Sequence, residues 1–273
     1  MKVRKVKAGF VGFGEVFSPR ELIEKKCLAA REALEARGME LVATAPVSDD
    51  PERVDEQRAI EDLSREDFDL LAVCVAGWIP SHTVIDVISH FAHKPMVLWG
   101  LTGHLENGRL VTTADQAGTT ALRDPMAGLG FNFKYVFDTV DAPYAAADKV
   151  KAFGEAARAV SLLKQAKIGY MGYRDMTLYA TLVDGVSLRR VVGPDIEVFP
   201  MLEVVQKMEA LVPDRVAEVV AELKDEWTFE EPVPDSALDT GVRMYLAVMD
   251  KVLERGYEAV SLVDVDGVKK LLH

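Results

Sequence analysis

A tryptophan stands at the end of a segment that the sequence predicts as a buried strand. Residues 69–99 read DLLAVCVAGWIPSHTVIDVISHFAHKPMVLW, and the apolar run 70–76 stops at Gly77, just before Trp78. A short apolar run that ends at a glycine is typical of a strand buried on both faces of a parallel sheet. Ligands of such sheets bind beyond the carboxyl ends of the strands. We therefore expect the indole of Trp78 to form one wall of a pocket.

Two glycines lie at the end of the first predicted strand, where a dinucleotide-binding turn would begin. Gly12 and Gly14 match the first two glycines of the G-x-G-x-x-G pattern, but Phe17 stands where the third is needed. The second predicted strand also ends without the acidic residue that would bind a ribose. The pattern therefore disfavours a nicotinamide cofactor. It leaves two interpretations, a tight turn or a substrate loop in which Glu15 and Arg20 face the crevice.

Histidines occur at two places where a ligand could reach them. His82, Asp86 and His90 have the i, i+4, i+8 spacing that lets them share one face of a helix. Two such side chains can bind a metal ion, although polar residues at this spacing more often face solvent. No further ligand accompanies them, and we assign no metal ligand in this sequence. His104 follows a predicted strand and is the better candidate for contact with a ligand.

Motifs of the common catalytic classes are missing from the sequence. It contains no G-x-S-x-G elbow, no P-loop and no H-E-x-x-H pair, so no catalytic residue is assigned. Asp264 and Asp266 are placed like the start of a calcium loop, but the third acid and the distal glutamate of such a loop are missing. Because the two acids follow a predicted strand, we expect them to form a polar rim of a pocket.

Alternating strand and helix patterns position these residues. Apolar runs predict strands over 6–13, 39–45, 68–76, 95–99 and 132–137. Amphipathic segments between them predict helices over 19–37, 50–63, 81–91 and 113–129. Ser18 and Ser81 have the residue type and position of N-caps, and Gly38 has those of a helix stop. Strands that alternate with helices predict a doubly wound parallel sheet with right-handed connections.

The pattern starts again after a long Ala-rich helix over 143–165, which we expect to connect two domains. Beyond it, strands are predicted over 167–171, 196–199 and 257–263, and helical segments over 175–182, 202–211, 213–224 and 235–255. The sequence therefore predicts two successive α/β domains of the Rossmann or flavodoxin type, residues 1–165 and 166–273. The second has few strands and is expected to be incomplete.

The net charge of the chain disfavours some classes of binding partner. The 273 residues carry 32 Lys and Arg against 44 Asp and Glu, a formal net charge of -12. This excess of acids disfavours nucleic acid and anionic membranes as partners. No apolar run approaches the roughly 20 residues of a membrane span, and the basic N-terminus lacks the apolar core of a signal peptide. Cys27 and Cys74 lack metal-ligand spacing and fit a reducing compartment, so we expect a cytoplasmic location.

Several stretches, taken together, resemble the L-fucose isomerase family. They follow the family's order through the whole chain and read VAGWIPSHTVIDV, HKPMVLWGLTG, KIGYMGYRDMTLYATLVDGVSL and VMDKVLERGYEAVSLVDVDG. The resemblance implies two N-terminal doubly wound α/β domains, followed by a C-terminal domain that carries the metal ligands. It also implies a homo-oligomer in which the first domain covers the active site of a neighbouring subunit.

The resemblance further implies interconversion of an aldose and a ketose through an ene-diolate. In such enzymes a divalent metal, typically manganese, polarises the substrate carbonyl, and two carboxylates move the protons. The family's metal ligands follow the strand that ends here near Val263, so none of them falls on a residue of this sequence. We therefore expect the N-terminal portion of such an isomerase, which contributes assembly and substrate enclosure and is inactive alone. The alternative is a stand-alone sugar-binding or regulatory α/β protein.

Substrate-facing positions of the family can be carried over to this sequence. Trp78 matches a tryptophan that packs against the sugar, and Met176 matches a rim position of the second domain. Asp264 falls near a polar substrate contact. Arg20 is a further candidate, although the loop around Val16 differs in length from the family's loop. The CH-rich face of a monosaccharide can stack on an indole, whereas the structural alternative is that Trp78 fills a domain interface.

Overall fold

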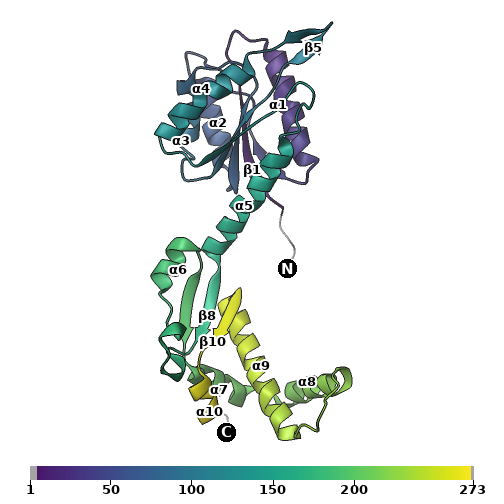
Figure 1. Cartoon of the computed structure of the whole chain (residues 1–273), viewed down its shortest axis with the longest axis vertical. Coiled ribbons are helices and arrows are strands. Elements are labelled where there is room, and N and C mark those ends of the chain that lie inside the picture. Colours follow the sequence, from purple (N-terminus) through teal and green to yellow (C-terminus); the bar gives the residue numbers. More distant parts are fainter. Residues whose placement is uncertain (1–4, 272–273) are drawn as a thin grey trace. The chain divides into compact units, whose positions relative to one another are not determined.

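The chain folds into two compact units. The computed structural model describes residues 5–271 and divides the chain into Met1–Ser161 and Leu162–His273 (Figure 1). Each unit has its own parallel sheet and its own apolar core. Among the described residues, no helix combines the length and the apolar character that crossing a membrane requires.

A five-stranded parallel sheet forms the centre of the first unit. Its strands are β1 (Lys7–Phe13), β2 (Glu40–Ala43), β3 (Leu70–Val75), β4 (Met96–Gly100) and β7 (Phe133–Phe137). They lie in the order β2-β1-β3-β4-β7, and every neighbouring pair is parallel. This is the flavodoxin-like order, so the predicted doubly wound sheet is confirmed. The direction of winding reverses between β1 and β3, whose carboxyl ends therefore border a crevice.

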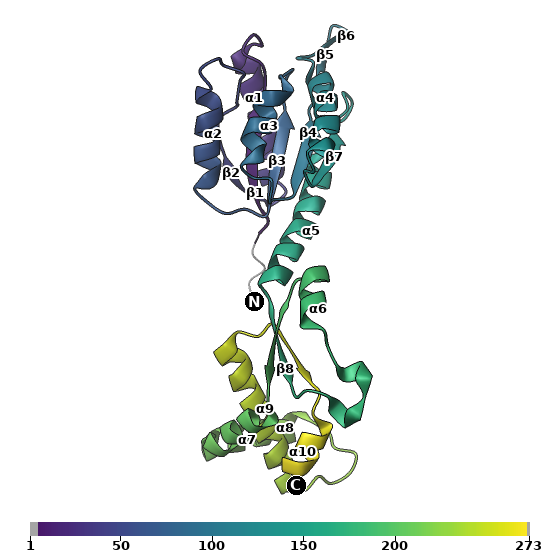
Figure 2. The same cartoon turned by 90° about the vertical axis from the view of Figure 1, so that its left-hand side faces the viewer.

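Helices cover both faces of this sheet (Figure 2). α1 (Arg20–Glu35) and α5 (Ala147–Gln165) pack on one face, and α2 (Val54–Ser64), α3 (Ser81–Ser89) and α4 (Asp115–Gly128) pack on the other. β3 is the middle strand, and all of its residues are buried. Its continuous apolar sequence is therefore explained by burial on two faces, as predicted.

The two predicted serine N-caps are wrong. α1 and α3 are preceded by Pro19 and Pro80, which occupy the cap positions, and no side chain caps either helix. Ser81 is the first residue of α3, and Ser18 lies one residue before the cap of α1. Proline fixes φ at about -65° and has no N–H to satisfy, so it can stand at the junction between loop and helix. The proline, and not the neighbouring serine, therefore sets the start of each helix.

A short hairpin that the sequence patterns did not reveal follows β4. Its strands β5 (His104–Glu106) and β6 (Arg109–Val111) are antiparallel. The turn between them is Asn107-Gly108, with φ values of 50° and 73°. Asparagine and glycine tolerate this left-handed conformation, which a two-residue hairpin turn requires at both positions. The hairpin lies beside the carboxyl edge of the sheet and contributes His104 to it.

A three-stranded parallel sheet forms the centre of the second unit. β8 (Lys167–Met171) lies between β10 (Ala259–Leu262) and β9 (Asp195–Phe199), and both neighbours are parallel to it. α7 (Met201–Ala210) and α9 (Asp235–Arg255) pack with the sheet around one apolar core. The second unit is therefore a smaller α/β fold with parallel strands, as predicted.

Further helices complete the second unit. α8 (Pro213–Glu226) packs on α9 around a small apolar cluster. α6 (Gly185–Val191) precedes β9, and α10 (Val265–Leu271) follows β10. Neither was predicted, because a helix of seven residues has too few turns to show a clear periodicity. Asp184, whose side chain accepts two backbone hydrogen bonds, caps α6.

Candidate functional site

The carboxyl ends of β1 and β3 form the edge of the sheet at which a ligand-binding site was predicted. Gly14 and Gly77 follow these strands, and a Cβ on them would lie 2.6 Å and 2.7 Å, respectively, from Cδ1 of Ile23. Ile23 belongs to α1 and is buried, so α1 can approach the sheet this closely only beside glycines. The glycines of the first turn therefore have a packing role here.

Trp78 lies at this edge with a fixed backbone and a partly exposed side chain. Its N–H donates to the Thr113 carbonyl at 2.7 Å, and its carbonyl accepts from the Glu15 N–H at 2.6 Å. The residue is 39% exposed, whereas Trp99 of β4 is fully buried. A partly exposed indole on a fixed backbone is a suitable platform for stacking. The predicted place of Trp78 after β3 is confirmed, and its contact with a ligand stays a prediction.

Arg20 lies at the start of α1 and is held by neighbouring groups. Its guanidinium donates to Glu24 Oε1 at 2.9 Å, to Asp55 Oδ2 at 3.0 Å and to the Pro46 carbonyl at 3.3 Å. The hydrogen bond to Glu24 is the largest cause that raises the pKa of Arg20 above its usual value. The side chain is still 46% exposed, so it can contact a molecule at this edge.

A cavity of about 180 Å³ lies beside Arg20. It is lined by the loop that follows β1 and by residues that follow β2, among them Ser48. The same loop carries Phe17, which is 90% exposed. In the sequence, Phe17 was considered only as a break in the glycine pattern. An aromatic residue in a short loop after a strand is the signal that could have identified it as a ligand-facing candidate.

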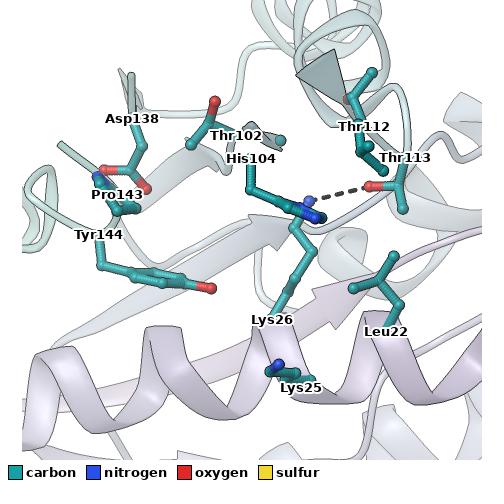
Figure 3. Close-up of a pocket in the computed structure, with 12 residues that line it drawn as sticks. Leu22, Lys25, Lys26, Thr102, His104, Thr112, Thr113, Asp138, Pro143 and Tyr144 are labelled. Atoms are coloured by element: carbon teal, nitrogen blue, oxygen red, sulfur yellow. Dashed lines mark hydrogen bonds between the residues drawn. The ribbon is translucent and has the colours of Figure 1, made fainter. Parts of the chain in front are cut away.

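A larger cavity of about 300 Å³ lies at the ends of β4 and β7 (Figure 3). Thr102 follows β4 and Asp138 follows β7, while Lys25 and Lys26 reach the cavity from α1. His104, which the sequence placed at a strand end, lines this cavity from the β5–β6 hairpin. The other four residues were not predicted as candidates from the sequence.

A buried ion pair lies at one side of the larger cavity. Lys26 is 8% exposed, and its ammonium pairs with the carboxylate of Asp115, which is 1% exposed. The same ammonium donates to Thr113 Oγ1 at 3.0 Å, and that hydroxyl donates to the Ala76 carbonyl at 2.6 Å. Lys26 and Asp115 are 89 residues apart, so no local sequence pattern links them. The pair joins α1 to the first turn of α4.

Asp138 holds the loop after β7 in place. Its Oδ2 accepts a hydrogen bond from Trp99 Nε1 at 2.9 Å, and its Oδ1 accepts from the Ala146 N–H at 2.9 Å. Burial is the largest cause that raises the pKa of Asp138, and these hydrogen bonds act against it. Both carboxylate oxygens are therefore engaged by the fold itself.

Met176 and Asp264 lie in the second unit, after β8 and β10. Met176 has a left-handed backbone, with φ 45°, and is 47% exposed. Asp264 Oδ1 accepts from the Gly267 N–H at 2.9 Å at the start of α10. The neighbouring Val265 N–H donates to Asp175 Oδ1 at 2.9 Å, which joins the two segments. The structure therefore brings these two candidates to one edge of the small sheet, while the other two belong to the first unit.

The described residues do not provide the metal site that the family resemblance implies. Within residues 5–271, no three His, Cys, Asp or Glu side chains form a group that could hold an ion. Asp86, the one acid of the predicted set His82, Asp86 and His90, pairs with Arg53 at 2.6 Å. These residues do not fit a manganese ion, and no chemical step is assigned through one.

Comparisons with known proteins leave the function to be argued from geometry. No protein-family model matches the chain, and no curated protein matches it. Two of the cavities of the first unit, those of about 180 Å³ and 300 Å³, lie along the carboxyl edge of its parallel sheet, where ligands of this fold class bind. Their surroundings supply hydrogen-bond donors, cations and aromatic rings, which are suited to binding a small polar molecule.

Proposed function

We propose that this chain is the substrate-enclosing and assembly part of an L-fucose isomerase-like protein, and that its first unit binds a monosaccharide. The observation that carries the proposal is the partly exposed side chain of Trp78, which follows β3 and whose backbone carbonyl accepts from Glu15 in the loop after β1. The CH-rich face of a sugar ring can stack on such an indole. The half-exposed guanidinium of Arg20 supplies N–H donors for sugar hydroxyl oxygens.

The proposal assigns binding, and not proton transfer, to the crevice. Asp55 is one of the two carboxylates that accept hydrogen bonds from Arg20. Burial acts to raise the pKa of Asp55, but hydrogen bonds from Ser48, Arg58 and Arg20 outweigh it and lower the pKa to about 2. Such a weakly basic carboxylate is poorly matched to general base catalysis near neutral pH. We therefore expect sugar binding without aldose–ketose conversion by this chain alone.

A homo-oligomer and a cytoplasmic location are further parts of the proposal. Tyr179 and Val186 of the second unit are 79% and 80% exposed, and a neighbouring subunit could cover such apolar side chains. Cys27 and Cys74 are buried and unbridged, which fits a reducing compartment.

Calorimetric titration with L-fucose and other neutral monosaccharides tests the binding proposal. We expect saturable binding in the presence of EDTA, and a loss of affinity of about tenfold or more in Trp78→Ala. Trp227→Ala is the matched control, because Trp227 is also exposed, at 60%, but belongs to the second unit. Absence of binding, or equal losses in the two variants, would contradict the proposed site.

An activity assay tests the division of roles. The chain is mixed with an aldose and manganese, and ketose formation is followed over time. No conversion above the background rate is expected. Conversion by this chain alone would show that catalytic groups lie within the sequence and that the assignment of binding without chemistry is wrong.

A further inference from the structure

We propose that the cavity lined by His104, Lys25 and Tyr144 is a second binding site, which takes the phosphate or carboxylate group of a small organic anion. The cavity lies between α1, the β5–β6 hairpin and the loop after β7 (Figure 3). Its volume of about 300 Å³ is at the lower end of the range for ligand pockets, so the occupant must be small. This inference does not depend on the monosaccharide proposal.

One unpaired ammonium among the described residues that line the cavity favours an anion. Lys25, Lys26 and His104 line it, and Asp138 is the one carboxylate among the described lining residues. Both oxygens of Asp138 already accept hydrogen bonds, one from the indole of Trp99 and one from a backbone N–H. Lys26 already has a counter-charge in Asp115, so Lys25 is the lining cation on which the case for an anion rests.

The two lysines have different roles. Lys26 is buried and already has its partner, the carboxylate of Asp115. Lys25 is exposed at the cavity, and within the described part of the chain no carboxylate lies within ion-pair distance of it. The adjacent Glu24 instead pairs with Arg20. The ammonium of Lys25 is therefore available for a charge-assisted hydrogen bond to a ligand.

Tyr144 supplies a neutral donor to the same space. Figure 3 shows its phenol reaching over α1 toward His104. Its backbone is left-handed, with φ 60°, which is uncommon for a bulky residue. Burial is the largest cause that raises the pKa of Tyr144 to about 12, so the hydroxyl keeps its proton at neutral pH. That hydroxyl makes no hydrogen bond to another residue of the described range.

The cavity thus gathers three donors from three separate segments. Lys25 comes from α1, His104 from the hairpin and Tyr144 from the loop after β7. An ammonium, an imidazole N–H and a phenol together match the several acceptor oxygens of a phosphate or carboxylate group. A neutral ligand would leave the Lys25 ammonium without a counter-charge.

Calorimetric titration at low ionic strength tests the site, with inorganic phosphate, glycerol 3-phosphate, L-malate and neutral glycerol as probes. We expect at least one anionic probe to bind and glycerol not to bind, and we expect added salt to weaken the binding. Comparing the phosphate probes with L-malate shows whether the site prefers a phosphate or a carboxylate group. Failure of all anionic probes to bind at millimolar concentration would overturn the proposal.

Variants locate the binding. Lys25→Gln/His104→Gln should lower the affinity for the bound anion about tenfold or more, and Tyr144→Phe should lower it severalfold. Lys151→Gln/His90→Gln is the matched control, because neither residue lines the cavity. Circular dichroism checks that each variant is folded. Unchanged affinity in the Lys25 and His104 variant would place the anion elsewhere and overturn the proposal, and Trp78→Ala should leave anion binding unchanged whether or not the sugar site exists.

Discussion

Gly12 illustrates how one missing side chain sets the approach of α1 to the sheet. A Cβ at this position would overlap the Sγ of Cys27 and lie 3.2 Å from its Cβ. Cys27 is 3% exposed, and Cys74, the register partner of Gly12 on β3, is fully buried. Burial is also the largest cause that raises the pKa of the Cys74 thiol, so this thiol stays protonated in the core. The neighbourhood therefore has no free volume for an added methyl group.

Gly12→Ala is expected to destabilise the first unit by about 1–3 kcal/mol, because the added Cβ overpacks the core beneath α1. Chemical denaturation followed by circular dichroism measures the loss. The double variant Gly12→Ala/Cys27→Ala removes the overlapping sulfur and should recover part of the free energy of unfolding. This explanation would be contradicted if the double variant lost more unfolding free energy than the two single variants lose together.

Asp55 should make the stability of the first unit depend on acid pH. Its pKa is lowered from 3.8 to about 2 in the folded chain. At pH values above the pKa of the unfolded state, the ionised carboxylate therefore stabilises the fold by about 2 kcal/mol. This contribution is lost as the pH falls from about 4 to about 2. Wild type should be more stable than Asp55→Asn at neutral pH, and the difference should shrink on acidification. A difference in unfolding free energy that stays constant with pH would refute the linkage.

At the scale of elements, the Lys26–Asp115 pair determines how α1 and α4 meet at the cavity. Both residues are nearly inaccessible to solvent. Asp115→Asn would leave the Lys26 ammonium buried without its counter-charge, and we expect a loss of about 3–5 kcal/mol in thermal or chemical unfolding. Glu155→Gln on α5 breaks the exposed Lys151 pair and is the control, with an expected effect of about 0.5 kcal/mol or less. Comparable losses of unfolding free energy in the two variants would show that burial does not determine how much an ion pair contributes to stability.

The elements with long or clearly bounded patterns were predictable from the sequence. α9 spans residues 235–255 and β8 spans 167–171, as predicted. The β5–β6 hairpin was not predicted, since strands of three residues carry too little alternation to be recognised. Its Asn107-Gly108 turn was the usable signal.

The candidate site was predictable only in part, for a related reason. Trp78 and His104 follow strands in the sequence, and the rule for parallel sheets places such residues at the carboxyl edge. Lys25 and Tyr144 reach the larger cavity from a helix face and from a loop. Which face of α1 borders a cavity depends on packing between distant segments, and hydrophobic periodicity does not encode it.

At the scale of the whole molecule, charge and apolar exposure are distributed differently. The chain has a net charge of -12, which opposes non-specific association. The second unit nevertheless exposes large apolar side chains over residues 173–191, a segment that includes the short helical turns η1 (Asp175–Thr177) and η2 (Tyr179–Thr181) and the helix α6. They are Tyr173, Tyr179, Val186 and Val191, which are 68%, 79%, 80% and 71% exposed. Exposure of this kind over one segment is typical of a surface that another chain covers.

We therefore expect the chain to self-associate through this segment. Light scattering coupled to size-exclusion chromatography should give a mass above that of one chain, and Tyr179→Ser/Val186→Glu should lower it, because a buried charge opposes the contact. Leu253→Glu is the matched control, since Leu253 is also exposed, at 73%, but lies on α9. A monomeric wild type would contradict the oligomer, and equal effects of the two variants would place the contact on another surface.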